Sequence, residues 1–132
     1  IALGMAGNAK SVAAVIRKAE QLSEGSDFSQ FLAITMACNE LRDARFSPVL
    51  YNLLNRHQVS GFALTDKKDV YDYADRTAGM KSIRNQTLKE ILLARALYRC
   101  GDRNGLGRRI LEAYSRDLRG IYAKFASGIL AE

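Results

Sequence analysis

The most informative segment of this sequence is Ala96-Leu97-Tyr98-Arg99-Cys100-Gly101-Asp102. A small residue and a hydrophobe come first, a second hydrophobe follows three positions later, and a Gly-Asp pair ends the segment. Glycine readily takes the left-handed conformation that ends a helix, and an aspartate carboxylate can cap the next helix. The segment therefore predicts a helix, a tight turn at Gly101-Asp102 and a second helix after it.

Two other segments have the same layout, namely Ala2-Leu3-Gly4-Met5-Ala6-Gly7-Asn8 and Ala37-Cys38-Asn39-Glu40-Leu41-Arg42-Asp43. Each copy predicts a helical hairpin that leaves one apolar face uncovered, and stacked hairpins bury such faces in a continuous core. The second and third copies lie farther apart than the first and second. This difference predicts an insertion near residues 57–86, with a short helix over residues 69–76.

The rest of the sequence also favours helices. Apolar residues recur at steps of three and four, period-two alternation is not sustained, and proline occurs only once. Helix starts are expected at Asn8, at Asp27 with Gln30, at Thr87 with Glu90, and at Asp102. The helices expected to be most buried are centred on Ile34, Cys38, Leu92 and Ala96. The predicted fold class is therefore all-α.

Residues 41–54 resemble the centre of a HEAT repeat. They read Leu-Arg-Asp-Ala-Arg-Phe-Ser-Pro-Val-Leu-Tyr-Asn-Leu-Leu. That family has an aspartate, a basic residue two positions later, a proline soon after and then two leucines. The residues that match are Asp43, Arg45, Pro48, Leu53 and Leu54. The third copy departs from the pattern, because Gly107 replaces the proline. The resemblance implies a right-handed α-α superhelix, a HEAT-like solenoid fragment of about three hairpins, as a single domain over residues 1–132.

A narrower resemblance is carried by residues 93–102, by Gly105-Leu106-Gly107, by Asp117-Leu118-Arg119-Gly120-Ile121-Tyr122-Ala123 and by Val59-Ser60-Gly61. These segments are similar to the C-terminal helical tail that follows the flavin domain in some bacterial FAD-dependent oxidoreductases. The resemblance implies a parent protein whose flavin site lies outside these residues, and no catalytic residue of that family has a matching position here. Ile1-Ala2-Leu3 is typical of a helix interior, so we expect a piece of a longer protein.

The composition is typical of a globular protein. Of the 132 residues, 48% are hydrophobic and 26% are charged, which is enough apolar sequence for a core. The longest apolar runs fall well short of the roughly 20 residues that a membrane-spanning helix needs, so no membrane partner is expected. The formal net charge of +6 permits a nucleic acid or another polyanion as partner, without requiring one.

The turn between the last two predicted hairpin helices is the candidate anion-binding segment. Backbone amides at a helix start attract anions, and Arg103, Arg108 and Arg109 add positive charge there. No predicted strand precedes this turn, so it is not a dinucleotide-binding fingerprint, and the Lys-Ser/Thr pair of a Walker phosphate-binding loop is absent. The alternative interpretation is a plain turn between repeat helices, as in the other copies.

Other polar and aromatic residues form no recognisable catalytic pattern. The aspartates that recur every three residues are Asp66, Asp69, Asp72 and Asp75. Their interleaved basic residues favour a solvated helix over a calcium loop. His57 is the single histidine, and no partner for catalysis or metal binding can be predicted for it. The tyrosines at helical spacing include Tyr71, Tyr73, Tyr114 and Tyr122. Packing at the edge of the core is their expected role, and base stacking is the alternative.

Cys38 and Cys100 lie within apolar helical patterns, and neither has a cysteine or histidine at metal-ligand spacing. We expect both to be free, buried and similar to small hydrophobes in their packing. Free thiols favour a reducing compartment such as the cytoplasm, whereas export of the parent protein would allow a disulfide. No metal or cofactor site is predicted in these residues.

The function that these patterns favour is a non-catalytic scaffold or protein-interaction module. It would pack against the remainder of its own chain or against a protein partner, because the repeats account for most residues. A basic helical-repeat module that binds a nucleic-acid backbone is the alternative, since residues 99–124 are rich in lysine and arginine. An enzyme with a pocket lined by the insertion is the third interpretation.

Overall fold

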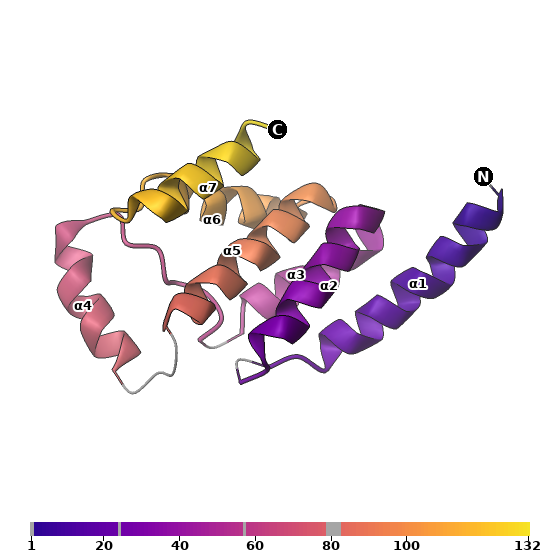
Figure 1. Ribbon diagram of the computed structural model, residues 1–132, viewed down its shortest axis with the longest axis horizontal. Helices are drawn as coiled ribbons and strands as arrows, with labels where there is room; N and C mark the ends of the chain where they lie inside the picture. The colour runs from indigo at the N-terminus through magenta and orange to yellow at the C-terminus, as the bar shows by residue number, and fades with distance from the viewer. Residues whose placement is uncertain (1, 24, 57, 79–82) are drawn as a thin grey trace.

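The computed structural model describes residues 2–23, 25–56, 58–78 and 83–132, and the regular structure in these ranges is entirely helical (Figure 1). The α-helices are α1 (Ala2–Glu20), α2 (Phe28–Leu41), α3 (Ser47–Leu54), α4 (Lys67–Thr77), α5 (Ile83–Arg99), α6 (Leu106–Ser115) and α7 (Gly120–Leu130). Short 3₁₀ helices over Ala44–Phe46 and Arg103–Gly105 precede α3 and α6. The all-α prediction is therefore confirmed for these residues. No helix within them combines the length and the apolar character needed to cross a membrane.

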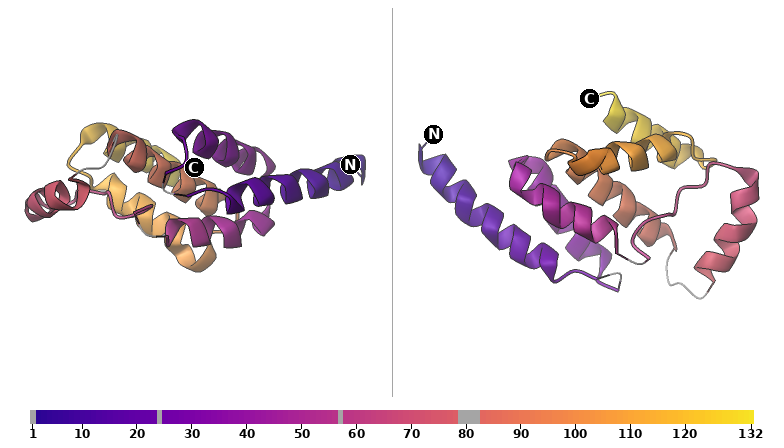
Figure 2. Two further views of the ribbon diagram at one scale, coloured as in Figure 1. Left: turned by 90° about the horizontal axis from the view of Figure 1, so that it is seen from below. Right: turned by 180° about the vertical axis from the view of Figure 1, so that it is seen from behind.

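The helices are arranged in two layers, and α4 stands apart from both. Figures 1 and 2 show α2, α5 and α7 running in one direction in one layer, with α3 and α6 running back in the other. The helix α1 covers one end and contacts both α2 and α3. The helix α5 contacts α2, α3 and α6, so it is the central element of the fold.

The turns of the two hairpins α2–α3 and α5–α6 have a similar layout, although Asp43 is extended at φ −101° and Asp102 is left-handed at φ 32°. The first helix of each pair ends with a residue in the left-handed region, Arg42 at φ 47° and Gly101 at φ 108°. An aspartate follows in both, and a 3₁₀ helix then leads into the second helix. Asp43 accepts a hydrogen bond from a backbone N–H of its 3₁₀ helix, and Asp102 caps α6. The turn predicted at Gly101-Asp102 is confirmed.

The hairpin predicted at the N-terminus is wrong, because α1 continues without a break from Ala2 to Glu20. Gly7 and Asn8 lie inside this helix, where a glycine costs only about 1 kcal/mol relative to alanine. The cost of one glycine is small enough for the surrounding helix formers to continue the helix through this position. Among the described residues, two hairpins therefore have such a turn, α2–α3 and α5–α6.

One of the two predicted capping boxes is confirmed. Asp27 and Gln30 form a reciprocal box at the start of α2. The predicted start at Thr87 is wrong, because α5 begins at Ile83 and Thr87 is buried within it. Glu90, three residues after Thr87, instead binds a segment that is distant in sequence. The spacing of Thr87 and Glu90 resembles a capping box, but the Glu90 carboxylate binds a backbone N–H that is distant in the sequence.

Two apolar clusters meet on α5 and hold the layers together. The first cluster joins α5 to α1, α2 and α3, and the second joins it to α6 and α7. The residues expected at the centres of the buried helices were Ile34, Cys38, Leu92 and Ala96, and none is more than 7% exposed. That prediction is confirmed.

The helix α4 lies inside the predicted insertion and confirms the short helix expected over residues 69–76. Asp66 caps it by accepting a hydrogen bond from the N–H of Lys68 at 3.0 Å. Val70 and Tyr71 are exposed on it, Tyr71 by 81%. Figure 1 shows α4 beyond the N-terminal end of α7, connected to the layers through the chain that follows α3.

Candidate functional site

The three arginines of the predicted anion-binding turn have separate surroundings. The guanidinium of Arg103 lies 5.4 Å from the ring centre of Tyr51. Arg108 forms an ion pair with Glu112, with 2.9 Å between Nε and Oε1. Arg109 lines a hollow of about 290 Å³ between α3 and α6. The fold does not gather these side chains at one point, and anion binding there remains a prediction.

The amides at the start of α6 already face an anionic group of the chain. Asp102 Oδ1 accepts a hydrogen bond from the N–H of Gly107 at 2.7 Å, and Oδ2 accepts one from the N–H of Arg108 at 3.2 Å. A carboxylate in this position interacts favourably with the helix dipole. An external phosphate would have to displace Asp102 from these donors.

The two cysteines are free and buried, as predicted. The Cys100 thiol donates a hydrogen bond to the carbonyl oxygen of Cys38 at 3.3 Å. Burial raises the pKa of Cys38 to about 12 and the pKa of Cys100 to about 11. Both groups are therefore protonated thiols at neutral pH, and thiols in that state are weak nucleophiles.

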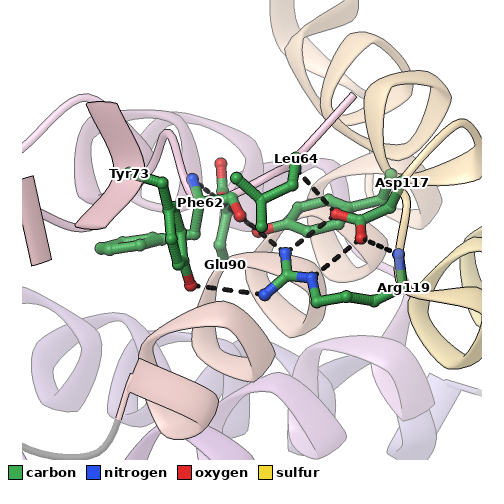
Figure 3. Close-up of polar contacts among 7 residues, drawn as sticks. Phe62, Leu64, Tyr73, Glu90, Asp117 and Arg119 are labelled. Carbon is green, nitrogen blue, oxygen red and sulfur yellow. Dashed lines mark hydrogen bonds and ion pairs between the residues drawn. The ribbon is translucent and has the colours of Figure 1, made fainter. Parts of the chain in front are cut away.

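A cluster of buried polar side chains holds residues 61–64, which we call the clamped segment (Figure 3). Glu90 on α5 is only 3% exposed. Its Oε2 accepts a hydrogen bond from the N–H of Gly61 at 2.9 Å, and its Oε1 accepts one from the N–H of Phe62 at 3.0 Å. The hydroxyl of Tyr114 also donates to Oε1, at 2.5 Å. One carboxylate thus ties the clamped segment to α5 and α6.

Residues just before α7 hold the other side of the clamped segment. Asp117 Oδ2 accepts a hydrogen bond from the N–H of Leu64 at 2.9 Å, and the N–H of Leu118 donates to the carbonyl oxygen of Leu64 at 2.7 Å. Arg119 Nη2 donates to the carbonyl oxygen of Phe62 at 2.8 Å. Backbone N–H and carbonyl groups of the clamped segment are therefore hydrogen-bonded, as they would be in a strand, but many of their partners are side chains.

Arg119 connects this cluster to α4. Its guanidinium forms a two-point ion pair with Asp117, with both N–O distances at 2.9 Å. The Tyr73 ring centre lies 5.5 Å away and the Tyr122 ring centre 4.6 Å away. Arg119 Nη1 also donates to the Tyr73 hydroxyl at 3.3 Å. These contacts of Tyr73 attach the exposed helix α4 to the cluster (Figure 3).

The charge states in the cluster are fixed by its surroundings. Burial favours a higher pKa for Asp117, but hydrogen bonds from Arg119 and from the N–H of Leu64 outweigh it and lower that pKa. Burial, together with the nearby carboxylate of Glu90, raises the pKa of Tyr114. At neutral pH Asp117 is therefore an ionised acceptor and Tyr114 a neutral donor.

The cluster is suited to positioning the backbone rather than to bond-making chemistry. Glu90 and Asp117 accept hydrogen bonds from backbone N–H groups and from the side chains of Tyr114 and Arg119. In residues 2–23, 25–56, 58–78 and 83–132, no group of three histidine, cysteine or carboxylate side chains can hold a metal ion. His57 lies outside the described residues. A second hollow, of about 440 Å³ and lined by Lys18, Gln21, Leu22, Ser26, Gln30, Ala33 and Ile34, contains no acid–base pair.

The sequence contains a signal for this cluster that a helical reading does not identify. Lys89 and Glu90 stand between Leu88 and an apolar run that begins at Ile91, and both charged residues are buried. Charged side chains are rarely buried unless they are paired. Two adjacent charges next to an apolar run therefore indicate partners elsewhere in the fold, but they do not identify those partners.

Comparison of the chain with protein-family models, with curated proteins and with solved structures gives no match. The resemblances to HEAT repeats and to the helical tail of flavoenzymes therefore remain predictions.

Lowering the pH should weaken the fold partly through Asp117. Because its folded-state pKa is below the ordinary value of 3.8, its ionised form stabilises the protein above that pH. The stabilisation is lost as the pH falls through the lowered pKa. Urea unfolding at about pH 7 and about pH 3 should show a smaller loss of stability for Asp117→Asn than for the wild type. An unchanged pH dependence in Asp117→Asn would contradict the assignment.

Proposed function

We propose that this chain is a non-catalytic protein-interaction module built as a HEAT-like fragment of a right-handed α-α superhelix. The alternation of helices between two layers supports this proposal, and so does the recurrence of one turn design in α2–α3 and α5–α6. In such a stack each hairpin buries its apolar face against the next, and the outer faces are available to partners. The insertion that contains α4 interrupts the stack between α3 and α5.

The observation that carries the proposal is an apolar surface at α7. Leu118, Ile121 and Phe125 are exposed by 52%, 74% and 41%. The opposite face of α7 packs on α6 through Ala126 and Ile129, which are buried. Contiguous exposed apolar side chains are typical of interaction sites in folded proteins. The partner is either a separate protein or the remainder of the parent chain.

The nucleic-acid alternative has weaker support. Three of the seven basic residues between positions 99 and 124 form ion pairs within the protein itself. Arg99 pairs with Glu132, Arg108 with Glu112, and Arg119 with Asp117. Tracking a phosphate backbone requires several cations that are free to face it. A protein partner therefore accounts better for the combination of paired charges and exposed apolar residues.

A photo-crosslinking residue at position 121 tests the proposal, with position 68 on α4 as the control. We expect a defined protein, or a defined segment of the parent chain, to crosslink at position 121 only. That partner, once purified, should bind the wild-type chain, and Ile121→Asp should weaken its binding about tenfold or more. Equal crosslinking at both positions, or unchanged affinity in Ile121→Asp, would overturn the proposal.

A further inference from the structure

Arg95 on α5 is a half-buried cation beside the exposed edge of α7. Its guanidinium lies 5.6 Å from the ring centre of Phe125. Its Nε is buried and has no hydrogen-bond partner within the described parts of the chain. Burial lowers the pKa of Arg95 and the neighbouring charge of Arg99 lowers it further, whereas the charge of Glu132 raises it.

The surroundings of Arg95 have an excess of positive charge. Arg99 binds Glu132 through both Nε and Nη2, with 2.9 Å between Nε and Oε2. The charges of Arg42 and Arg95 also contribute to lowering the pKa of Glu132, after the hydrogen bond from Arg99. Arg99 thus binds the carboxylate of Glu132, and Arg42 and Arg95 lie near enough for their charges to act on it. In Figure 1 the C-terminal ends of α2, α5 and α7 point toward the same end of the molecule, which is where these side chains originate.

Apolar side chains adjoin these charges. Phe125, which stacks under Arg95, is exposed by 41%, and Ile121, one turn earlier on α7, is exposed by 74%. We call the residues Arg42, Arg95, Arg99, Ile121 and Phe125 the Arg95 surface. It offers a charged guanidinium edge for a planar anion and an apolar ridge for a hydrophobic side chain.

We propose that the Arg95 surface binds an acidic segment of a protein partner. A carboxylate of that segment binds the Arg95 guanidinium, and a hydrophobic side chain of the same segment packs on Ile121 and Phe125. This inference rests on the proposed function, and it adds the chemistry of the partner. A peptide fits better than a nucleic acid, because Ile121 and Phe125 make the surface partly apolar.

Binding of defined probes to the full chain tests the proposal. The probes are a short fluorescein-labelled peptide of glutamates and leucines, a matched peptide of lysines and leucines, and a labelled oligothymidylate. We expect saturable binding of the acidic peptide, measured by fluorescence anisotropy, and weaker binding of the other two. Tighter binding of the oligonucleotide, or no saturable binding of the acidic peptide, would overturn the proposal.

Two substitutions of Arg95 and one control separate specific recognition from general charge. Arg95→Met keeps an apolar stem over Phe125 and should weaken binding of the acidic peptide about tenfold or more. Arg95→Lys keeps the charge without the planar fork, and it should cause a smaller but measurable loss. Arg108→Met removes the same charge at a site that is paired with Glu112, and it should change affinity less than about twofold.

Equal losses in Arg95→Met and Arg108→Met would show general charge attraction and would refute the proposal. Urea unfolding of each variant checks that the fold is retained, and Arg95→Lys provides the comparison if Arg95→Met is destabilised. The inference and the proposed function can fail separately. A partner that crosslinks at position 121 but binds Arg95→Met and Arg95→Lys normally would refute only the inference. If nothing crosslinks specifically at position 121, the proposed function itself fails.

Discussion

Replacing Glu90 with alanine is expected to lower the free energy of unfolding by about 3–5 kcal/mol. The substitution removes the acceptor of the N–H groups of Gly61 and Phe62 and of the Tyr114 hydroxyl, and the donors of Phe62 and Tyr114 are buried. Each buried donor without a partner costs about 1–3 kcal/mol. Because total stability in domains of this size is typically about 5–15 kcal/mol, a large fraction of it depends on this side chain. Urea unfolding followed by circular dichroism measures the change.

Two further variants make this prediction specific. Glu90→Gln keeps the shape and one acceptor oxygen, so its loss should be smaller than that of Glu90→Ala. Glu112→Ala removes a carboxylate from the exposed pair with Arg108, and exposed pairs contribute no more than about 1 kcal/mol. If Glu90→Ala were no more destabilising than Glu112→Ala, the clamped segment would not depend on Glu90 for its stability.

Replacing Gly107 with alanine is expected to destabilise the fold by about 1–3 kcal/mol, although alanine is the better helix former. A Cβ atom at this position would lie 2.7 Å from the carbonyl oxygen of Ala94 and 2.9 Å from the backbone nitrogen of Tyr98. Both contacts are with the backbone of α5, so relief requires α5 and α6 to separate. The missing side chain at Gly107 is therefore what allows these two helices to approach so closely.

Gly128→Ala is the matched control for this substitution. Gly128 also lies inside a helix, α7, but a Cβ atom there meets nothing within 4 Å. Alanine at that position should stabilise the protein by about 0.5–1 kcal/mol, through helix propensity alone. Thermal unfolding of both variants should give shifts of opposite sign. A stabilising effect of Gly107→Ala would show that α5 and α6 do not pack as described.

The turns between helices could be predicted from sequence because their chemistry is local. Gly101 ends the turn of α5 through its own positive φ. Asp102 caps α6 by accepting a hydrogen bond from the N–H of Gly107, only five residues later. The capping box of Asp27 and Gln30 is equally local. The same local reading was wrong for Thr87, because α5 begins at Ile83. It was also wrong at Asn8, where nothing nearby forces a helix to end.

Sequence periodicity and turn chemistry determined that the chain is helical, that Gly101-Asp102 forms a turn, that the core includes Ile34 and Cys38, and that a short helix lies in the insertion. Only the tertiary structure assigned partners to the buried charges. Glu90 binds residues 28 and 29 positions away, and Asp117 binds Leu64 from 53 positions away. Arg95 likewise lies beside Phe125 only because α5 and α7 are brought together in the fold. Caps and helical periods are set by neighbours along the chain, whereas the partner of a buried charge is set by which helices pack against it. That packing is a property of the whole fold.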